Sequence, residues 1–523
     1  MDSEPLVLPI CTVQPDFLSV IADIRGGLVP EETFWLSCYK SGEPSVHGKV
    51  YATLDEVNRD SVRYDGRDGV QLLHSGEALY SASCASLQIL PTRLAMPTKA
   101  YSENEGRKAT KITAFDVSPD GSQFATGHMD GSVHISQTLQ SRPIESCRPH
   151  VSTVTSLRFF PSSRVLLTAS SDFSLSILPA APSDDPSAAS VPITPARRFY
   201  GHTRGITSTA IVSKGRNLLS SANDGTVRLW DVPSESQIRT IDSSNGSCVP
   251  VLAISIGEET LQTDANTAEE TEAGVDPREV DTEDKVVFAA LQDGTFEALD
   301  LRTKRSVFQS QAPPGRGKNI LQAITYAPTE NLVATGSTNG VVSVYDTRVL
   351  STPLTTFKRN TASIEDLAFV PLDPSSFVTD SGAGARAGVG DGSGVGLAIA
   401  TEDGLPYVAD VRPEGPGVRA ELIGSDCDAV RAVRVVQIQE PEVWTAADDG
   451  AVRRYRVRSY DVNRKRRIGE VRVTILTTIL TTIPPPEALQ RSEAVQSTRR
   501  FSLLICVAGT PLYCLRQPRV CFA

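Results

Sequence analysis

Short apolar stretches alternate with polar positions along most of the chain, and a tight turn separates each pair of such stretches. An alternation with a period of two residues predicts β-strands that bury one face. Between residues 111 and 457 the turn is Asp-Gly or a near variant in seven places. Asp-Gly and Asn-Gly readily adopt the positive φ angles that a two-residue hairpin turn needs. The seven turn positions are Asp130, Asp172, Asp224, Asp293, Asn339, Asp403 and Asp449.

The hairpins recur at a spacing typical of a repeat architecture. Successive turn positions are 42, 52, 69, 46, 64 and 46 residues apart, and a four-stranded propeller blade takes about 40 to 45 residues. The pattern therefore predicts an all-β fold, a seven-bladed propeller over residues 101–458. A single ring replaces the roughly three to four domains that the length of the chain would otherwise indicate.

Three segments lengthen the repeat where the spacing is largest. They are rich in Pro, Ser, Gly or acidic residues, so they cannot bury enough apolar area to fold alone, and we expect disordered surface loops. The segments are residues 179–197, 258–285 and 381–396. The formal net charge of the chain is −11. Because residues 258–284 hold 11 acidic side chains and one Arg, they account for nearly all of this charge.

The most regular repeat unit covers residues 201–232, GHTRGITSTAIVSKGRNLLSSANDGTVRLWDV, and resembles the WD40 repeat in full. It opens on Gly-His and closes on Trp-Asp. The resemblance implies that His202, Ser220, Asp224 and Trp230 form a hydrogen-bonded chain that pins the loop between blades to the turn within the blade. We interpret this set as structural and not as a catalytic triad. The other repeats lack one or more of its members: the second has Asp172 but no Trp.

The two ends of the chain do not show the repeat. Residues 33–54 have a strand, turn, strand pattern, so we expect residues 1–100 to form a small N-terminal β extension. The last blade has three obvious strands, and a closed ring needs a fourth. Two segments compete for that place, one within residues 77–94 and one at 471–483, and we favour the N-terminal one. Residues 459–523 are basic and apolar and are expected to be a poorly ordered tail.

Charge, cysteines and targeting signals bound the class of protein. A net negative chain is a poor general surface for nucleic acid. The nine cysteines show no Cys-x-x-Cys pair, and residues 1–15 do not show the basic start and uninterrupted apolar stretch expected of a signal peptide. No run of apolar residues reaches the about 18 that a membrane-spanning helix needs. We expect a protein of the cytoplasm and nucleus with no nucleic-acid or membrane partner; Arg464–Arg467 are a candidate nuclear localisation signal.

Catalytic motifs are not evident. All six histidines lie within the first 202 residues, and the sequence contains no nucleophile elbow, P-loop or zinc motif. We therefore expect no enzyme activity, no cofactor and no bound metal.

Three stretches extend the resemblance beyond the generic WD40 repeat. They are residues 35–50 (WLSCYKSGEPSVHGKV), residues 201–231 with TAIVSKGRN after the first strand, and residues 422–457, where LIGSDCDAVRAV precedes VWTAADDGAVRRYRV. Together they resemble the proteasomal ATPase-associated factor family, whose fungal members are assembly chaperones of the base of the proteasome regulatory particle.

The family resemblance implies a non-catalytic scaffold that binds the C-terminal domain of one or more proteasomal AAA ATPase subunits. We expect the protein to be a monomer. In that family the contact uses acidic propeller residues against a basic patch. The candidates here are acidic positions on the propeller rim that turn formation does not explain: Glu365, Asp426, Asp428 and Asp448.

A substrate receptor of a cullin-type ubiquitin ligase is the alternative function. Asp-x-Arg follows the third strand of three blades and resembles part of an adaptor-binding box. The pairs are Asp300/Arg302, Asp346/Arg348 and Asp410/Arg412. None of them follows the Trp that the full box requires, so we favour a role in capping the turn.

Overall fold

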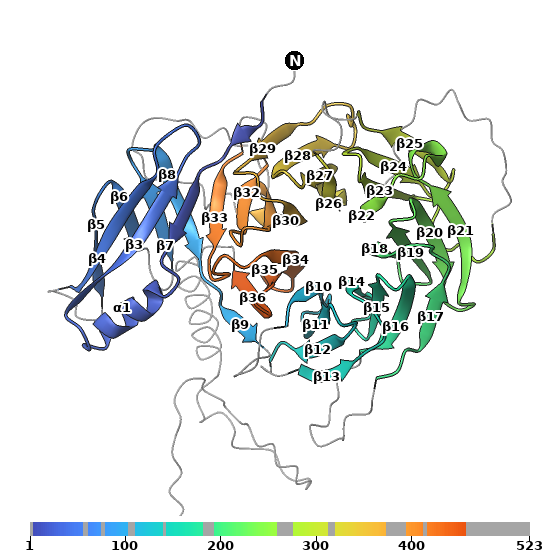
Figure 1. The fold of residues 1–523 in the computed structure, drawn as a ribbon, viewed down its shortest axis with the longest axis horizontal. Coiled ribbons are helices and arrows are strands. Elements are labelled where there is room, and N and C mark those ends of the chain that lie inside the picture. Colours follow the sequence, from blue (N-terminus) through green and yellow to red (C-terminus); the bar gives the residue numbers. More distant parts are fainter. Residues whose placement is uncertain are drawn as a thin grey trace, which may run out of the picture. The chain divides into compact units, whose positions relative to one another are not determined.

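The structure is a computed structural model that describes residues 4–55, 61–74, 79–102, 110–139, 143–180, 193–258, 276–311, 319–372, 394–411 and 416–456. Seven antiparallel sheets, each built on four strands, form a ring (Figure 1), and residues of their innermost strands line a central channel. This is the seven-bladed propeller that the hairpin pattern predicts. No helix in the described part of the chain is long and apolar enough to cross a bilayer.

Each blade follows the same strand order. The first strand lines the channel and the outermost strand lies at the periphery (Figure 1). The innermost strands are β10 (Ile112–Val117), β14 (Val154–Phe159), β18 (Ile206–Val212), β22 (Val251–Glu258), β26 (Leu321–Ala327), β30 (Ile364–Leu372) and β34 (Val430–Gln437). The second strands are β11 (Gln123–His128), β15 (Val165–Ser170), β19 (Asn217–Ala222), β23 (Lys285–Leu291), β27 (Leu332–Ser337), β31 (Gly394–Thr401) and β35 (Pro441–Ala447).

The third and fourth strands complete the blades. The third strands are β12 (Val133–Gln137), β16 (Ser174–Pro179), β20 (Thr226–Asp231), β24 (Phe296–Asp300), β28 (Val341–Asp346), β32 (Tyr407–Asp410) and β36 (Ala451–Arg456). The outer strands of blades one to six are β13 (Pro143–Cys147), β17 (Arg197–Tyr200), β21 (Ser236–Asp242), β25 (Arg305–Gln309), β29 (Thr355–Lys358) and β33 (Val418–Leu422). Short 3-10 turns lie at Ser244–Gly246 and Pro328–Glu330.

All seven predicted turn residues lie between the second and third strand of a blade. The residue that follows has a positive φ, and it is glycine in six of the seven turns. Asp side chains hold several of these turns: Asp224, for example, accepts hydrogen bonds from the backbone N–H and the hydroxyl of Thr226, at 3.1 and 2.7 Å. The Asp-Gly and Asn-Gly pairs in the sequence therefore mark turns whose backbone requires a positive φ.

A short strand, β9 (Lys99–Ser102), closes the ring by pairing antiparallel with β36. Closure by an N-terminal segment, which the sequence analysis favoured, is confirmed, but the strand lies in neither of the two proposed ranges. Residues 77–94 instead contribute β7 (Tyr80–Cys84) and β8 (Ile89–Ala95) to another sheet, and residues 471–483 lie outside the described ranges. Buried Tyr101 fixes β9 in place, since its ring stacks on Trp444 and its hydroxyl donates to the Thr138 carbonyl at 2.8 Å.

The N-terminal region is larger than the predicted β element. Its strands form two sheets, β2-β3-β4-β5 and β6-β7-β8, and helix α1 packs its Phe17, Ile21 and Ile24 into the core between them. The elements are β1 (Leu6–Val7), β2 (Ile10–Val13), α1 (Phe17–Arg25), β3 (Glu31–Tyr39), β4 (Val46–Leu54), β5 (Val62–Gly66) and β6 (Val70–His74), followed by β7 and β8. The predicted strand, turn, strand segment corresponds to β3 and β4.

Two N-terminal strands extend propeller blades. Strand β1 runs parallel to β29 at the outer edge of blade five, and β8 runs parallel to β33 at the outer edge of blade six (Figure 1). These two blade edges are therefore paired and do not present open hydrogen-bonding groups.

The predicted limits of the three inserts were too wide. Pro179, Arg197, Glu258, Lys285 and the segment 394–396 all belong to strands, because their backbones pair with neighbouring strands. Residues 276–284 also have a defined structure: the Arg239 guanidinium donates to Glu279 at 2.6 Å, and the Val280 N–H donates to the Asn217 side chain at 2.8 Å. The remaining parts of the inserts, and residues 459–523, lie outside the described residues.

Candidate protein-binding face of the propeller

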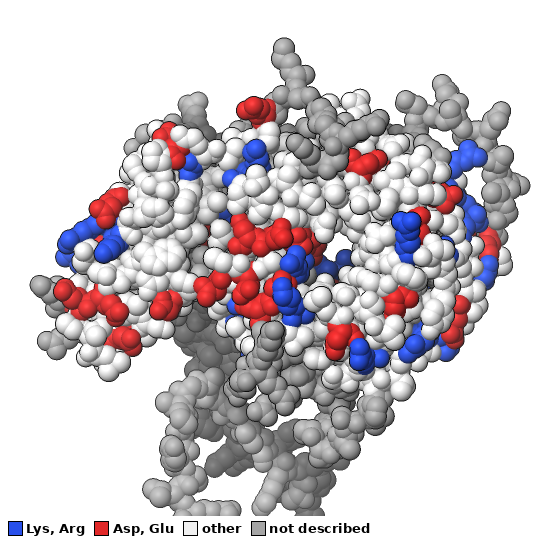
Figure 2. Space-filling model, viewed as in Figure 1, with Lys and Arg blue, Asp and Glu red and all other residues white. Residues whose placement is uncertain are grey.

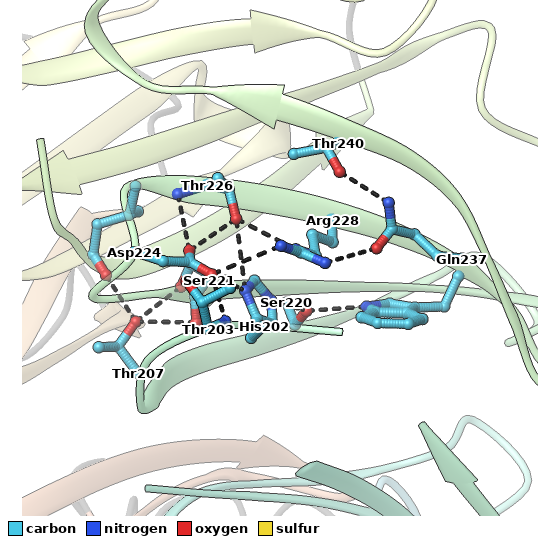
Figure 3. Close-up of polar contacts among 12 residues, drawn as sticks. His202, Thr203, Thr207, Ser220, Ser221, Asp224, Thr226, Arg228, Gln237 and Thr240 are labelled. Atoms are coloured by element: carbon cyan, nitrogen blue, oxygen red, sulfur yellow. Dashed lines mark hydrogen bonds and ion pairs between the residues drawn. The ribbon is translucent and has the colours of Figure 1, made fainter. Parts of the chain in front are cut away.

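The network expected in blade three is present as a chain of short contacts (Figure 3). His202 Nδ1 lies 2.9 Å from Asp224 Oδ2, and His202 Nε2 lies 2.7 Å from Ser220 Oγ. The Trp230 indole N–H donates to the same hydroxyl at 2.8 Å. The imidazole of His202 and the indole of Trp230 are buried, so the network links the loop before β18 to the turn after β19. The Ser220 side chain is itself fully buried.

Blade two carries a second network of this kind, which sequence reasoning missed. His150 Nδ1 lies 3.1 Å from Asp172 Oδ2, and His150 Nε2 lies 2.9 Å from Thr168 Oγ1. Leu178 stands where blade three has its Trp. The signal was in the spacing: His precedes the hydroxyl residue by 18 positions and the Asp by 22 in both blades.

Burial sets the protonation of both networks. Desolvation lowers the pKa of His150 and of His202, and the neighbouring carboxylates offset this only in part. Burial alone would raise the pKa of Asp224, but hydrogen bonds from the Thr203 N–H, from Thr226 and from His202 lower it overall. The stable arrangement at neutral pH is therefore a neutral imidazole that donates from Nδ1 to an ionised carboxylate.

The turns between second and third strands and the loops that lead into the next blade lie on one face, here called the upper face. Figure 2 shows acidic side chains gathered on this face over the strands of blades six and seven. Three exposed side chains in the turns and loops there define the acidic cluster: Glu402 in the turn after β31, and Asp426 and Asp428 in the loop before β34. Asp426 and Cys427 both have positive φ, so this loop is tightly curved.

The structure separates the four predicted contact residues into two kinds. Glu365 and Asp448 are engaged within the propeller, because Arg431 donates to both carboxylates at 3.0 Å and Lys111 donates to Asp448 at 2.9 Å. Both carboxylates are largely buried. Asp426 and Asp428 are exposed. Only the latter two are free to meet a partner without breaking a described ion pair of the ring.

A further ion-pair network crosses the channel wall. Arg434 of blade seven donates to Asp116 of blade one at 3.0 Å and also to Asp366 of blade six. Asp116 accepts from the Phe159 N–H of blade two at 2.7 Å, and Arg158 lies 3.8 Å from it. These contacts span four consecutive blades around the point of closure. Their charges compensate each other locally, which is typical of a structural network.

Seven four-stranded blades, a closing N-terminal strand and His-Ser-Asp-Trp bonding define a β-propeller. The WD40 family model, described as WD domain, G-beta repeat, matches residues 100–135, 141–177 and 193–231, which cover most of blades one to three. Three segments of the ring therefore match the WD40 repeat, and WD40 repeats build protein-interaction scaffolds. A search of the curated proteins found no match to the chain.

Proposed function

We propose that this protein is a non-catalytic scaffold that holds a basic protein partner on its upper face. The observation that carries the proposal is that Glu402, Asp426 and Asp428 are all exposed and come from two separate segments that touch, because Gly404 lies against the backbone of Cys427 and Asp428. Acidic side chains placed in this way attract a basic surface and fix its register. In the ion-pair network at the channel wall, by contrast, the charged side chains pair with one another.

The partner class follows from the sequence resemblance. We propose that the basic surface belongs to the C-terminal domain of a proteasomal AAA ATPase subunit, and that the protein chaperones assembly of the base of the proteasome regulatory particle. The segment that carries the most specific part of the resemblance, residues 422–457, includes the loop with Asp426 and Asp428. The proposed contact and the resemblance therefore fall on the same loop.

The ubiquitin-ligase alternative gains no support from the Asp-x-Arg pairs. Asp300 and Asp346 accept hydrogen bonds from the backbone N–H groups of Arg302 and Arg348, at 2.8 and 2.9 Å. These contacts form the turn that leads to the outer strand, as the capping interpretation predicts. Arg412 lies outside the described residues.

Binding of purified ATPase C-terminal domains, each tested separately against the full chain, tests the proposal. A triple reversal, Glu402→Lys with Asp426→Lys and Asp428→Lys, should weaken binding at least about tenfold and remove most of its salt dependence. Glu330→Lys is the control, because Glu330 is exposed in the 3-10 turn between β26 and β27, on the opposite face. Equal binding by the triple variant, or no binding of any ATPase domain by the native protein, would overturn the proposal.

A further inference from the structure

The upper face also carries an exposed apolar group on blades one and two. Met129 is 59% exposed, Val151 85% and Phe173 45%. They come from three neighbouring segments: the turn after β11, the loop before β14 and the turn after β15. The segments touch, because the Val151 N–H donates to Asp172 at 3.0 Å and Thr153 Oγ1 donates to the Met129 carbonyl at 3.4 Å. Met129, Val151 and Phe173 are called the apolar patch below.

Phe173 is held in a conformation that its residue type disfavours. Its φ is +71°, and the equivalent residue is glycine in the other six turns of the ring. A bulky residue in the left-handed region is strained by contact between its Cβ and the backbone. Asp172 maintains this turn, accepting from the Ser174 N–H at 3.0 Å and its hydroxyl at 2.6 Å. The hairpin does not need the aromatic ring, since glycine serves the same turn elsewhere.

An exposed aromatic side chain on a strained backbone points to a binding role, because neither its exposure nor its strain stabilises the fold. Large aromatic side chains are also frequent anchors of protein interfaces. The surroundings of the apolar patch indicate the charge of its occupant. Asp130, next to Met129, is exposed and accepts a hydrogen bond from Arg148 at its backbone carbonyl, at 2.7 Å, and the acidic cluster lies in turns and loops of the same face.

We propose that the apolar patch anchors a peptide segment of the protein partner, in which an apolar side chain lies close to Lys or Arg residues. The apolar side chain packs against Phe173, Met129 and Val151, and the basic residues lie toward Asp130 and the acidic cluster. The basic character of this segment rests on the proposed function. The apolar anchor rests on the exposure and strain of Phe173.

The first test uses Phe173→Gly, which introduces the residue present in the other six turns. Removing the strain should raise the melting temperature by a few degrees, about 2–4 °C. Met129→Ser removes apolar surface without relieving strain and should not raise it. Leu139→Ala is the matched control, because Leu139 is 91% exposed and follows β12 at the opposite face.

Binding is measured with a displayed library of random twelve-residue peptides, so that the readout does not depend on the ATPase domains. The native protein should enrich peptides that combine an apolar side chain with Lys or Arg. Phe173→Gly and Met129→Ser should each weaken binding of the enriched peptides at least about tenfold, and Leu139→Ala should not. No enrichment of such peptides, or full binding by Phe173→Gly, would overturn the anchor.

The two proposals fail in different ways. If an ATPase C-terminal domain binds through the acidic cluster but is unaffected by Phe173→Gly and Met129→Ser, the anchor falls and the proposed function stands. If every ATPase domain fails to bind while the library yields apolar and basic peptides that need Phe173, the proposed function falls and the anchor stands.

Discussion

Two buried groups meet at the Ser220 hydroxyl, the indole N–H of Trp230 and the imidazole of His202. Replacing Ser220 by Ala leaves both without this partner, and an unpaired buried polar group costs about 1–3 kcal/mol. We predict that Ser220→Ala lowers the free energy of unfolding by about 2–4 kcal/mol, measured by urea denaturation.

Thr168→Ala in blade two provides the matched comparison. Thr168 holds His150 but has no indole to satisfy, since Leu178 takes that place. Its substitution should therefore cost less than that of Ser220. Equal losses for the two variants would show that the indole bond contributes nothing.

The two buried histidines make stability depend on pH. Burial lowers their pKa below the ordinary value of 6.5, so the folded protein binds fewer protons there than the unfolded chain. Their contribution is complete above pH about 6.5 and is lost as pH falls through the lowered pKa values. We predict a decline in melting temperature from pH 7 to pH 5. A His150→Gln/His202→Gln variant should have a lower melting temperature at pH 7 and a shallower decline; an unchanged slope would contradict the assignment.

At the scale of single residues, the sequence predicted the contacts made within one short repeat and missed the contacts made between distant strands. His202, Ser220, Asp224 and Trp230 lie within one unit, so a pattern identifies them. The pairing of Glu365 with Arg431 joins two blades across 66 positions, and no local pattern encodes it. That is why two of four candidate contact residues proved to be engaged inside the ring.

At the scale of elements, the hairpins were predictable because each needs positive φ at its turn and an alternating pattern on both sides. The closing strand was not, because Lys99–Ser102 has only four residues and its identity depends on pairing with β36. The sequence analysis missed helix α1, although its buried residues Phe17, Val20, Ile21 and Ile24 follow helical spacing. A single short helix gives only a brief stretch of this periodic pattern within a β-rich chain.

Tyr101 offers a direct test of ring closure. The side chain is buried, stacks on Trp444, packs against Phe124 and bonds the Thr138 carbonyl. Truncating a buried aromatic costs about 3–5 kcal/mol. We predict that Tyr101→Ala lowers the free energy of unfolding by this amount and speeds amide hydrogen exchange in β36. Ala100→Ser, at an exposed position of the same strand, should change neither; slow exchange in β36 of Tyr101→Ala would mean that another element closes the ring.

At the scale of the whole described chain, the N-terminal region and the propeller are joined by backbone pairing as well as by side chains. Strand β8 pairs with β33, and the Ile423 N–H donates to the Ala95 carbonyl at 2.9 Å. Residue 423 leads directly into the loop that carries Asp426 and Asp428. The N-terminal region therefore positions the acidic cluster, and the two regions should act as one unit in binding.

A buried ion pair lies at this junction. Glu421 accepts from Arg359 of blade five at 2.6 Å and from the Cys11 N–H of β2 at 3.0 Å. Burial raises the pKa of Glu421, and Arg359 opposes that rise. Arg359→Met removes the cation and leaves the carboxylate buried, which costs about 3–5 kcal/mol. We predict a loss of this size in the free energy of unfolding at pH 7.

The pH dependence of Arg359→Met separates charge from packing. Without Arg359 the folded pKa of Glu421 rises further above its unfolded value, so the cost is greatest at pH 7 and shrinks as pH falls through the raised pKa. The double variant Arg359→Met/Glu421→Gln should recover much of the loss at pH 7, because no buried charge remains. If the double variant is as unstable as Arg359→Met at pH 7, the junction depends on the shape of the arginine side chain, including its packing over the Tyr407 ring at 4.2 Å, and not on charge compensation.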